Sequence, residues 1–208
     1  MKQKEISIAI NCYIIAFAIV LLAVLTFVVL YMPNIREFDQ QILHAVQGVL
    51  IQFPISVAEF VSRFGAGDFW LWPRITAVAV MISHKYYMKA FLFVIFTQLT
   101  YHVNDDWLKP LICRERPCDS LAAGFSFPSG HVAFQVCMCG ILIYLVHKYV
   151  NTDWWRTILI TIFSIWIVAV CVSRMWLNAH FLTDVTAGFC VGIIMVNLYI
   201  ILDKFFSK

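Results

Sequence analysis

The sequence predicts an all-α membrane protein, a polytopic bundle of about six transmembrane helices that forms a single domain over residues 1–208. Of the 208 residues, 62% are hydrophobic and 13% are charged, whereas soluble domains carry about 25% charged residues. The mean hydropathy is +0.84, and the apolar residues are gathered into separate long runs. The net charge is only +3 and the basic residues are scattered, which excludes a nucleic-acid partner.

Six apolar runs form the expected spanning helices. The first follows a short charged N-terminus, is too long for the apolar part of a secretory signal and lacks a small-x-small cleavage site, so we expect a retained signal anchor. Several other runs are shorter than the roughly 20 residues that a bilayer requires, and flanking residues must supply their missing turns. The runs cover residues 6–31, 69–83, 90–108, 132–147, 157–172 and 185–202.

The stretch between the first two runs, residues 32–68, is expected to lie on the outer face of the membrane. It contains a mildly apolar piece, 48–61, that carries Pro54 and Glu59. We interpret this piece as an interfacial or re-entrant helix. A seventh crossing of the membrane is the alternative.

Lysines and arginines predict the orientation of the bundle. With the N-terminus inside, the inner segments hold eight of these residues and the outer segments hold four, once the three cations of the motifs below are set aside. We therefore expect a protein of the cell inner membrane with both termini in the cytoplasm. The inner residues are Lys2, Lys4, Lys85, Lys89, Lys148, Arg156, Lys204 and Lys208, and the outer ones are Arg36, Arg63, Arg74 and Arg114.

Three polar motifs occupy two of the connections between spans, the third-to-fourth and the fifth-to-sixth. Because successive spans alternate in direction, both connections must open on the same face of the membrane. We therefore expect residues 109–184 to form one site, on the outer, periplasmic face in the orientation above. The motifs read Lys109-x6-Arg116-Pro117, Pro128-Ser129-Gly130-His131 and Ser173-Arg174-x5-His180-x3-Asp184.

Lys109, Arg116 and Arg174 place three positive charges around one point. Such a cluster suits the equatorial oxygens of a phosphoryl group in transfer, because arginine offers a planar bidentate fork and lysine a point charge. An isolated basic residue at a helix end more often contacts lipid headgroups. Asp105, four residues before Lys109, either orients the lysine by an ion pair or marks where the helix reaches water.

The Pro128–His131 motif is expected to open the fourth span. Serine is a favoured N-cap and glycine permits close approach, so free backbone N–H groups of Ser129 and Gly130 should bind an anion with help from the helix dipole. His131, on the first turn, is then placed to protonate a leaving oxygen as general acid. A turn with an incidental interfacial histidine is the alternative for this motif alone.

His180 and Asp184 are spaced to share one face of a helix, so the carboxylate can orient the imidazole while the other ring nitrogen faces a substrate. That arrangement suits a nucleophile and its orienting group. A structural helix pair or half of a metal site has the same spacing. The three motif cations would repel a metal ion, and no cysteine–histidine ligand spacing occurs, so we expect no metal and no cofactor.

The three motifs, in this order and without a gap or substitution, resemble those of the type-2 phosphatidic acid phosphatase family, which shares its site with vanadium haloperoxidases. The resemblance implies an integral membrane lipid phosphatase in which His180 attacks phosphorus and forms a phosphohistidine that water hydrolyses, without a metal. It implies a phosphorylated lipid as substrate: undecaprenyl pyrophosphate, phosphatidylglycerol phosphate, phosphatidic acid or a lipid A phosphate.

Two other functions compete with hydrolysis. A lipid-to-lipid phosphotransferase would use the same site and pass the phosphoryl group to a lipid hydroxyl instead of to water. An anion transporter would carry charges throughout its helices and an inverted repeat. Here the charges gather at one face and no repeat is visible, which disfavours transport.

Cys113 and Cys118 lie together in a polar loop and flank its arginines. On the outer face they would meet an oxidising compartment, where a disulfide would stiffen the loop that presents Arg116. Two free thiols are the alternative. The sequence favours the disulfide.

Overall fold

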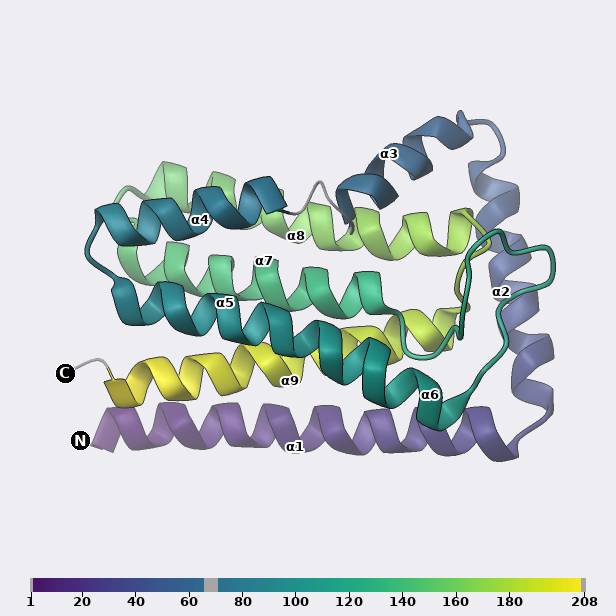
Figure 1. Ribbon diagram of the computed structural model, residues 1–208, viewed down its shortest axis with the longest axis horizontal. Coiled ribbons are helices and arrows are strands. Elements are labelled where there is room, and N and C mark those ends of the chain that lie inside the picture. Colours follow the sequence, from purple (N-terminus) through teal and green to yellow (C-terminus); the bar gives the residue numbers. More distant parts are fainter. Residues whose placement is uncertain (1, 66–70, 207–208) are drawn as a thin grey trace.

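The computed structural model describes residues 2–65 and 71–206, and every regular element in these ranges is helical (Figure 1). This confirms the all-α bundle expected from composition. In chain order the helices are α1 (Lys2–Tyr31), α2 (Asn34–Leu50), α3 (Ile55–Gly65), α4 (Leu71–Ser83), α5 (Tyr87–Tyr101), a π-helical segment (His102–Leu108), α6 (Lys109–Ile112), α7 (Gly130–Tyr149), α8 (Asp153–Trp176) and α9 (Leu182–Phe206).

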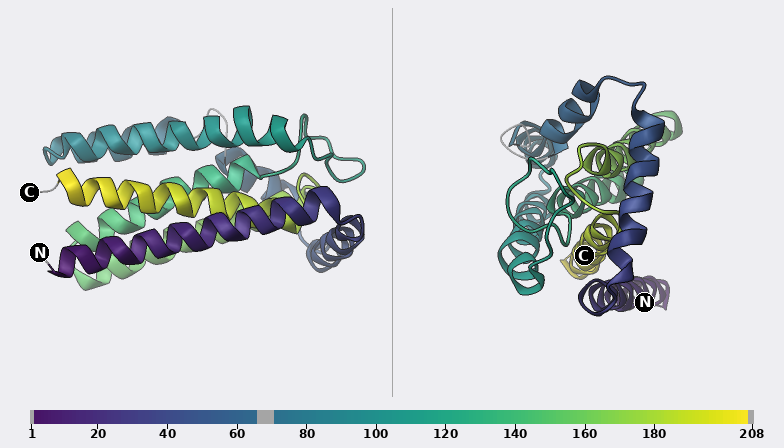
Figure 2. Two further views of the ribbon diagram at one scale, coloured as in Figure 1. Left: turned by 90° about the horizontal axis from the view of Figure 1, so that it is seen from below. Right: turned by 90° about the vertical axis from the view of Figure 1, so that its right-hand side faces the viewer.

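The long helices run side by side along the molecule, and α2 lies across one end of them (Figures 1 and 2). At the opposite end, α1 begins and α9 ends. The α6–α7 and α8–α9 connections both lie at the end that α2 crosses. The alternation of helix directions predicts that these two connections lie at the same end of the bundle, and the structure shows them there.

Close packing of α7 against α9 forms the centre of the bundle. A Cβ atom at Gly188 of α9 would collide with the carbonyl oxygen of Ser129, and one at Gly192 would lie 2.5 Å from Cβ of Val136. Small residues four apart allow this kind of contact between membrane helices. The start of α7, with its motif, is therefore held directly against α9.

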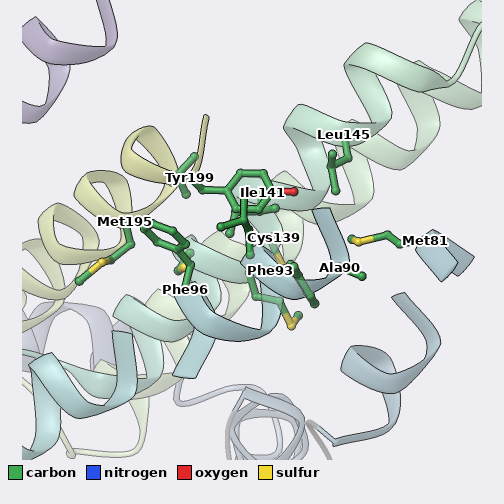
Figure 3. Packing of buried hydrophobic residues seen from close by; sticks show 13 residues of the cluster. Met81, Ala90, Phe93, Phe96, Cys139, Ile141, Leu145, Met195 and Tyr199 are labelled. Atoms are coloured by element: carbon green, nitrogen blue, oxygen red, sulfur yellow. The ribbon is translucent and has the colours of Figure 1, made fainter. Parts of the chain in front are cut away.

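A layer of buried side chains joins α4, α5, α7 and α9 (Figure 3). The hydroxyl of Tyr199 donates to the backbone carbonyl of Lys89 at 3.3 Å, so this large buried residue keeps its polar atom paired. The layer fixes the helices relative to one another and thereby supports the two connections at their far end. The labelled members are Met81, Ala90, Phe93, Phe96, Cys139, Ile141, Leu145, Met195 and Tyr199.

Four of the described helices, α1, α7, α8 and α9, are long and apolar enough to cross a membrane. Flanking residues lengthen the expected spans, as in α8, which covers Asp153–Trp176 where the apolar run covers 157–172. α4 is a shorter apolar helix, and the first two residues of its expected span, at 69 and 70, lie outside the described residues. The chain is a multi-pass membrane protein, while the count of six crossings stays a prediction.

The mildly apolar piece at 48–61 is not one continuous helix, because the chain breaks within it, and its interfacial or re-entrant position stays a prediction. α2 ends at Leu50 and α3 begins at Ile55, and the two helices meet at 117°. Pro54 lies in the break, where it has no N–H to donate and disfavours helical geometry in the residue before it. As a result α2 crosses the end of the bundle and α3 turns back against α8.

Candidate active site

A cavity of about 670 Å³ lies where the two connections meet. Its walls contain residues from all three motifs, so the structure brings together groups that are far apart in the sequence. Asp184 and Ser129 are the exceptions among the expected site residues, because both are fully buried behind the wall. The charged and polar lining residues are Arg74, Gln98, Tyr101, Asp105, Lys109, Arg116, His131, Arg174 and His180.

His180 is presented by the connection between α8 and α9 and is almost fully buried. Its Nδ1 lies 3.5 Å from Oδ2 of Asp184, a contact longer than a normal hydrogen bond. Nη1 of Arg116 lies 3.2 Å from the other ring nitrogen, Nε2. A guanidinium can only donate, so Nε2 accepts and the ring proton of the neutral imidazole is on Nδ1. The lone pair of Nε2 therefore faces the cations of the cavity.

Burial is the main reason why the pKa of His180 falls from 6.5 to about 4. The carboxylate of Asp184 acts in the opposite direction, whereas the charges of Arg174 and Arg116 lower the pKa further. The imidazole is therefore neutral at neutral pH. A nitrogen nucleophile must be in this form, because protonation removes its lone pair.

Asp184 is held by donors on both oxygens of its carboxylate. Oδ2 accepts the backbone N–H of Phe181 at 2.9 Å, and Oδ1 accepts Nη1 of Arg114. These bonds fix the plane of the carboxylate, so Oδ2 stays directed toward Nδ1 of His180.

Arg114 links this carboxylate to α2, a role beyond that of an outer-face cation, which is all that its sequence position predicts. Its Nη2 lies 2.7 Å from Oδ2 of Asp39. Thr183 completes the network, because its hydroxyl accepts from Arg114 at 2.6 Å and donates to Asp39. Asp39 and Asp184 are fully buried, so the guanidinium between them offsets the cost of removing two carboxylates from water.

Only one of the two missed residues had a signal in the sequence. Arg114 precedes Arg116 by two positions beside Pro117, and side chains two apart in an extended segment point the same way. That pattern could have placed Arg114 near the site. Asp39 had no such signal, because only the crossing of α2 over the bundle end brings it to Arg114.

Arg116 and Arg174 are fixed from different sides of the cavity. Arg116 donates from Nε to the carbonyl of Gly124 at 2.9 Å and from Nη1 to that of Ala179 at 2.7 Å. Arg174 donates to the hydroxyl of Ser62 on α3. Arg174 lines the cavity, and its guanidinium has more N–H donors than this one bond uses, so the arginine can also donate to a bound anion.

Lys109 and Asp105 form an ion pair, which is the first of the two roles that the sequence allowed for Asp105. Gly130 makes room for it, because a Cβ atom there would lie 2.5 Å from Oδ2 of Asp105. The neighbouring Asn104 donates to the carbonyl of Pro128 at 3.2 Å. The π-helical segment is thus tied to the start of α7, in keeping with the frequent occurrence of π-helical turns at functional sites.

One expectation for Ser129 is wrong, because its backbone N–H is not free. It donates to the carbonyl of Asp184 at 2.9 Å, which the close packing of α7 and α9 brings to the start of α7. The hydroxyl makes no capping bond to the helix and has no partner among residues 2–65 and 71–206. The N–H groups available to an anion therefore begin at Gly130, which lines the cavity.

The expected disulfide is also wrong. Cys113 and Cys118 are exposed free thiols. Cys113 ends α6 in the left-handed conformation, with φ at 53°, and its thiol donates to the carbonyl of Pro110 at 2.9 Å. This hydrogen bond ties the thiol to α6 instead of to the other cysteine.

Fold and cavity together define a class of protein, an all-helical membrane protein with a cluster of cations and histidines at one end of its bundle. The family model described as PAP2 superfamily matches residues 86–207, more than half of the chain, and the protein belongs to this superfamily. The resemblance to the type-2 phosphatidic acid phosphatases is thereby confirmed.

Two proteins of the same superfamily are similar to this chain in sequence or in structure. Phosphatidylglycerophosphatase B of Bacillus subtilis (strain 168) is 32% identical over 77 residues, which are 36% of this chain and 38% of the relative's length. The crystal structure of a transmembrane PAP2-type phosphatidylglycerolphosphate phosphatase from Bacillus subtilis has a TM-score of 0.80 and 25% sequence identity, covering 95% of this chain and 98% of that one.

Proposed function

We propose that the protein is a lipid phosphatase that releases inorganic phosphate from the terminal phosphomonoester of phosphatidylglycerol phosphate. Membership of the superfamily supports hydrolysis of a lipid phosphate, and both relatives carry the name of this activity. The observation that carries the proposal is the meeting of a neutral, buried His180 with Lys109, Arg116 and Arg174 at one cavity.

In the proposed reaction, Nε2 of His180 attacks phosphorus in line with the bond to the leaving oxygen. The N–P bond forms as the P–O bond breaks. The bound phosphate anion offsets the neighbouring cations and lets His131 hold a proton, and the imidazolium gives this proton to the oxygen, which departs as the lipid alcohol. Lys109, Arg116 and Arg174 stabilise the charge on the equatorial oxygens. Water, deprotonated by His131, then attacks the phosphohistidine and releases inorganic phosphate.

The proposed reaction uses no metal ion and no cofactor. The three cations supply the positive charge that a metal supplies in other phosphoryl-transfer sites. In the described ranges, no group of three or more histidine, cysteine, aspartate or glutamate side chains is arranged to hold a metal.

We also propose that both termini lie in the cytoplasm and that the cavity opens on the outer side of the cell inner membrane. The bias of lysines and arginines supports this orientation. The start of α1 and the end of α9 share the end of the bundle opposite the cavity (Figure 1), as the orientation requires.

Substitution of the proposed nucleophile tests the function. His180→Ala should lower phosphate release about 10³-fold or more, because no other group in the cavity can form the covalent intermediate. The assay uses purified protein in detergent, with a chelator, on phosphatidylglycerol phosphate, phosphatidic acid, undecaprenyl pyrophosphate and a lipid A phosphate. His147→Ala is the matched control, because His147 is exposed near the far end of α7.

The panel separates the alternatives. Fastest release from phosphatidylglycerol phosphate supports the proposed substrate, and a faster lipid would replace it. Robust activity of a folded His180→Ala variant would remove the histidine as nucleophile. Phosphate transfer to an added lipid hydroxyl, without release to water, would identify a phosphotransferase.

A further inference from the structure

Arg74 is a cation of the cavity that belongs to none of the three motifs. It lies in the first turn of α4, an apolar helix, and lines the cavity together with His131, Lys109 and Arg174. A charged side chain among apolar membrane helices is costly and is retained chiefly where it has a function. The proposed reaction gives Arg74 no task.

The contacts of Arg74 leave its charge without a counterion. Nη1 donates to Oε1 of Gln98 at 3.3 Å, and Nη2 donates to the carbonyl of Val94 at 3.0 Å. None of the carboxylates in the described part of the chain pairs with Arg74. A guanidinium has five N–H donors, so Nη1 and Nη2 each keep a second N–H at the cavity wall, and such donors are suited to bind an anion.

A chain of hydrogen bonds holds Gln98 in the orientation that Arg74 needs. Nδ1 of His102 lies 2.6 Å from Oδ2 of Asp106, and the carboxylate can only accept, so Nδ1 carries the ring proton. The Nε2 of His102 then accepts from Nε2 of Gln98 at 3.1 Å. This fixes the amide, whose Oε1 faces Arg74, and the guanidinium is held in place before any ligand binds.

Arg74 lies on the membrane side of the motif cations. It is bonded at the level of Val94 and Gln98, and Gln98 precedes Asp105 by two turns of the same continuous helix, a rise of roughly 10 Å. Asp105 pairs with Lys109 at the outer end of that helix. A lipid whose terminal phosphate meets the motif cations would therefore pass Arg74 before its acyl chains enter the bilayer.

We propose that Arg74, positioned by Gln98, is a second anion subsite that binds the diester phosphate of phosphatidylglycerol phosphate. This lipid carries a terminal phosphomonoester, then a glycerol bridge, then a charged phosphodiester and only then the acyl chains. Its two charged groups follow in the same order as the motif cations and Arg74 along the cavity wall. Phosphatidic acid has no second phosphate. In a lipid diphosphate the second phosphorus is one oxygen away and stays among the motif cations. The inference rests on the proposed function, which it refines.

Substrate pairs that differ in the second charge test this subsite. The substrates are dioctanoyl phosphatidylglycerol phosphate, the same lipid with its diester methylated to an uncharged triester, and dioctanoyl phosphatidic acid. In the wild-type protein, methylation should lower kcat/KM about tenfold or more, because a charge-assisted hydrogen bond is lost. Arg74→Gln should lower the ratio of kcat/KM for phosphatidylglycerol phosphate over phosphatidic acid by about the same factor.

Two further variants complete the experiment. Arg74→Lys keeps the charge without the planar fork and should retain part of the ratio. Arg63→Gln is the matched control, since Arg63 is an exposed arginine of α3 outside the cavity wall. The comparison of lipids by the wild-type protein needs no variant and tests recognition of the diester charge, and Arg74→Lys assigns it to Arg74 even where Arg74→Gln does not fold.

The outcomes are distinct. Equal losses on all three lipids would make Arg74 a structural residue and overturn the subsite, as would an unchanged ratio together with indifference of the wild-type protein to methylation. Failure of the wild-type protein to hydrolyse phosphatidylglycerol phosphate at all would overturn the proposed function as well. That failure is visible before any variant is measured.

Discussion

Arg114 is a residue on which the site depends although it lies behind the cavity wall. It pairs with two buried carboxylates, Asp39 on α2 and Asp184 beside His180. Removing one partner of a buried ion pair costs about 3–5 kcal/mol, because the other charge stays buried and unpaired. An unpaired Asp184 would have to take up a proton or admit water, and either change loosens its hold on His180.

Arg114→Gln should therefore lower kcat about 10²-fold while KM changes little, because orientation of the proposed nucleophile is lost and the phosphate-binding cations remain. Steady-state kinetics on phosphatidylglycerol phosphate in detergent would measure both constants. Arg36→Gln is the matched control: Arg36 pairs with Glu115 across the same two segments, but both side chains are exposed, and such pairs contribute about 0–1 kcal/mol. A loss confined to KM would mean that Arg114 contacts the substrate instead.

At the scale of elements, the site depends on how closely the start of α7 approaches the π-helical segment. Gly130 allows this approach, and any larger residue meets the carboxylate of Asp105. Gly130→Ala should lower kcat/KM about tenfold or more, because displacement of Asp105 also displaces Lys109 from the phosphate position. Gly48→Ala on α2 is the control, since nothing lies near its added Cβ atom. Full activity of Gly130→Ala would show that the Lys109–Asp105 pair tolerates movement.

The elements also show where sequence reasoning succeeds and where it stops. The motif residues could be placed at one end of one bundle because helix alternation is a property of membrane chains in general. The break at Pro54 and the path of α2 could not be predicted from the sequence, because a mildly apolar stretch is compatible with several arrangements. The prediction of a free backbone N–H at Ser129 was wrong for a related reason. The carbonyl of Asp184 accepts from this N–H only because α7 packs on α9.

At the scale of the whole molecule, the free thiols of Cys113 and Cys118 report the orientation in the membrane. Both are exposed and belong to the α6–α7 connection, which lies at the cavity end, so a membrane-impermeant maleimide should label them in intact spheroplasts if that end faces outward. In a cysteine-free background, Ser83→Cys supplies the control, because Ser83 is exposed at the end of α4 and should react only after the membrane is opened. The reverse labelling pattern would invert the proposed orientation.

The crossing of α2 over the bundle end has a consequence for how a lipid reaches the cavity. α2 is locked to the bundle through Asp39 and Arg114, so lifting it away would uncover two buried carboxylates at once. The wall formed by α4 and α5 is joined by the hydrogen bonds of Arg74 to Val94 and Gln98, and none of the ion pairs among the described residues links these two helices. Its lining residues Leu71 and Tyr101 are half exposed. Entry of a lipid from the bilayer side, past Leu71 and Tyr101, therefore uncovers fewer buried charges than entry by displacement of α2.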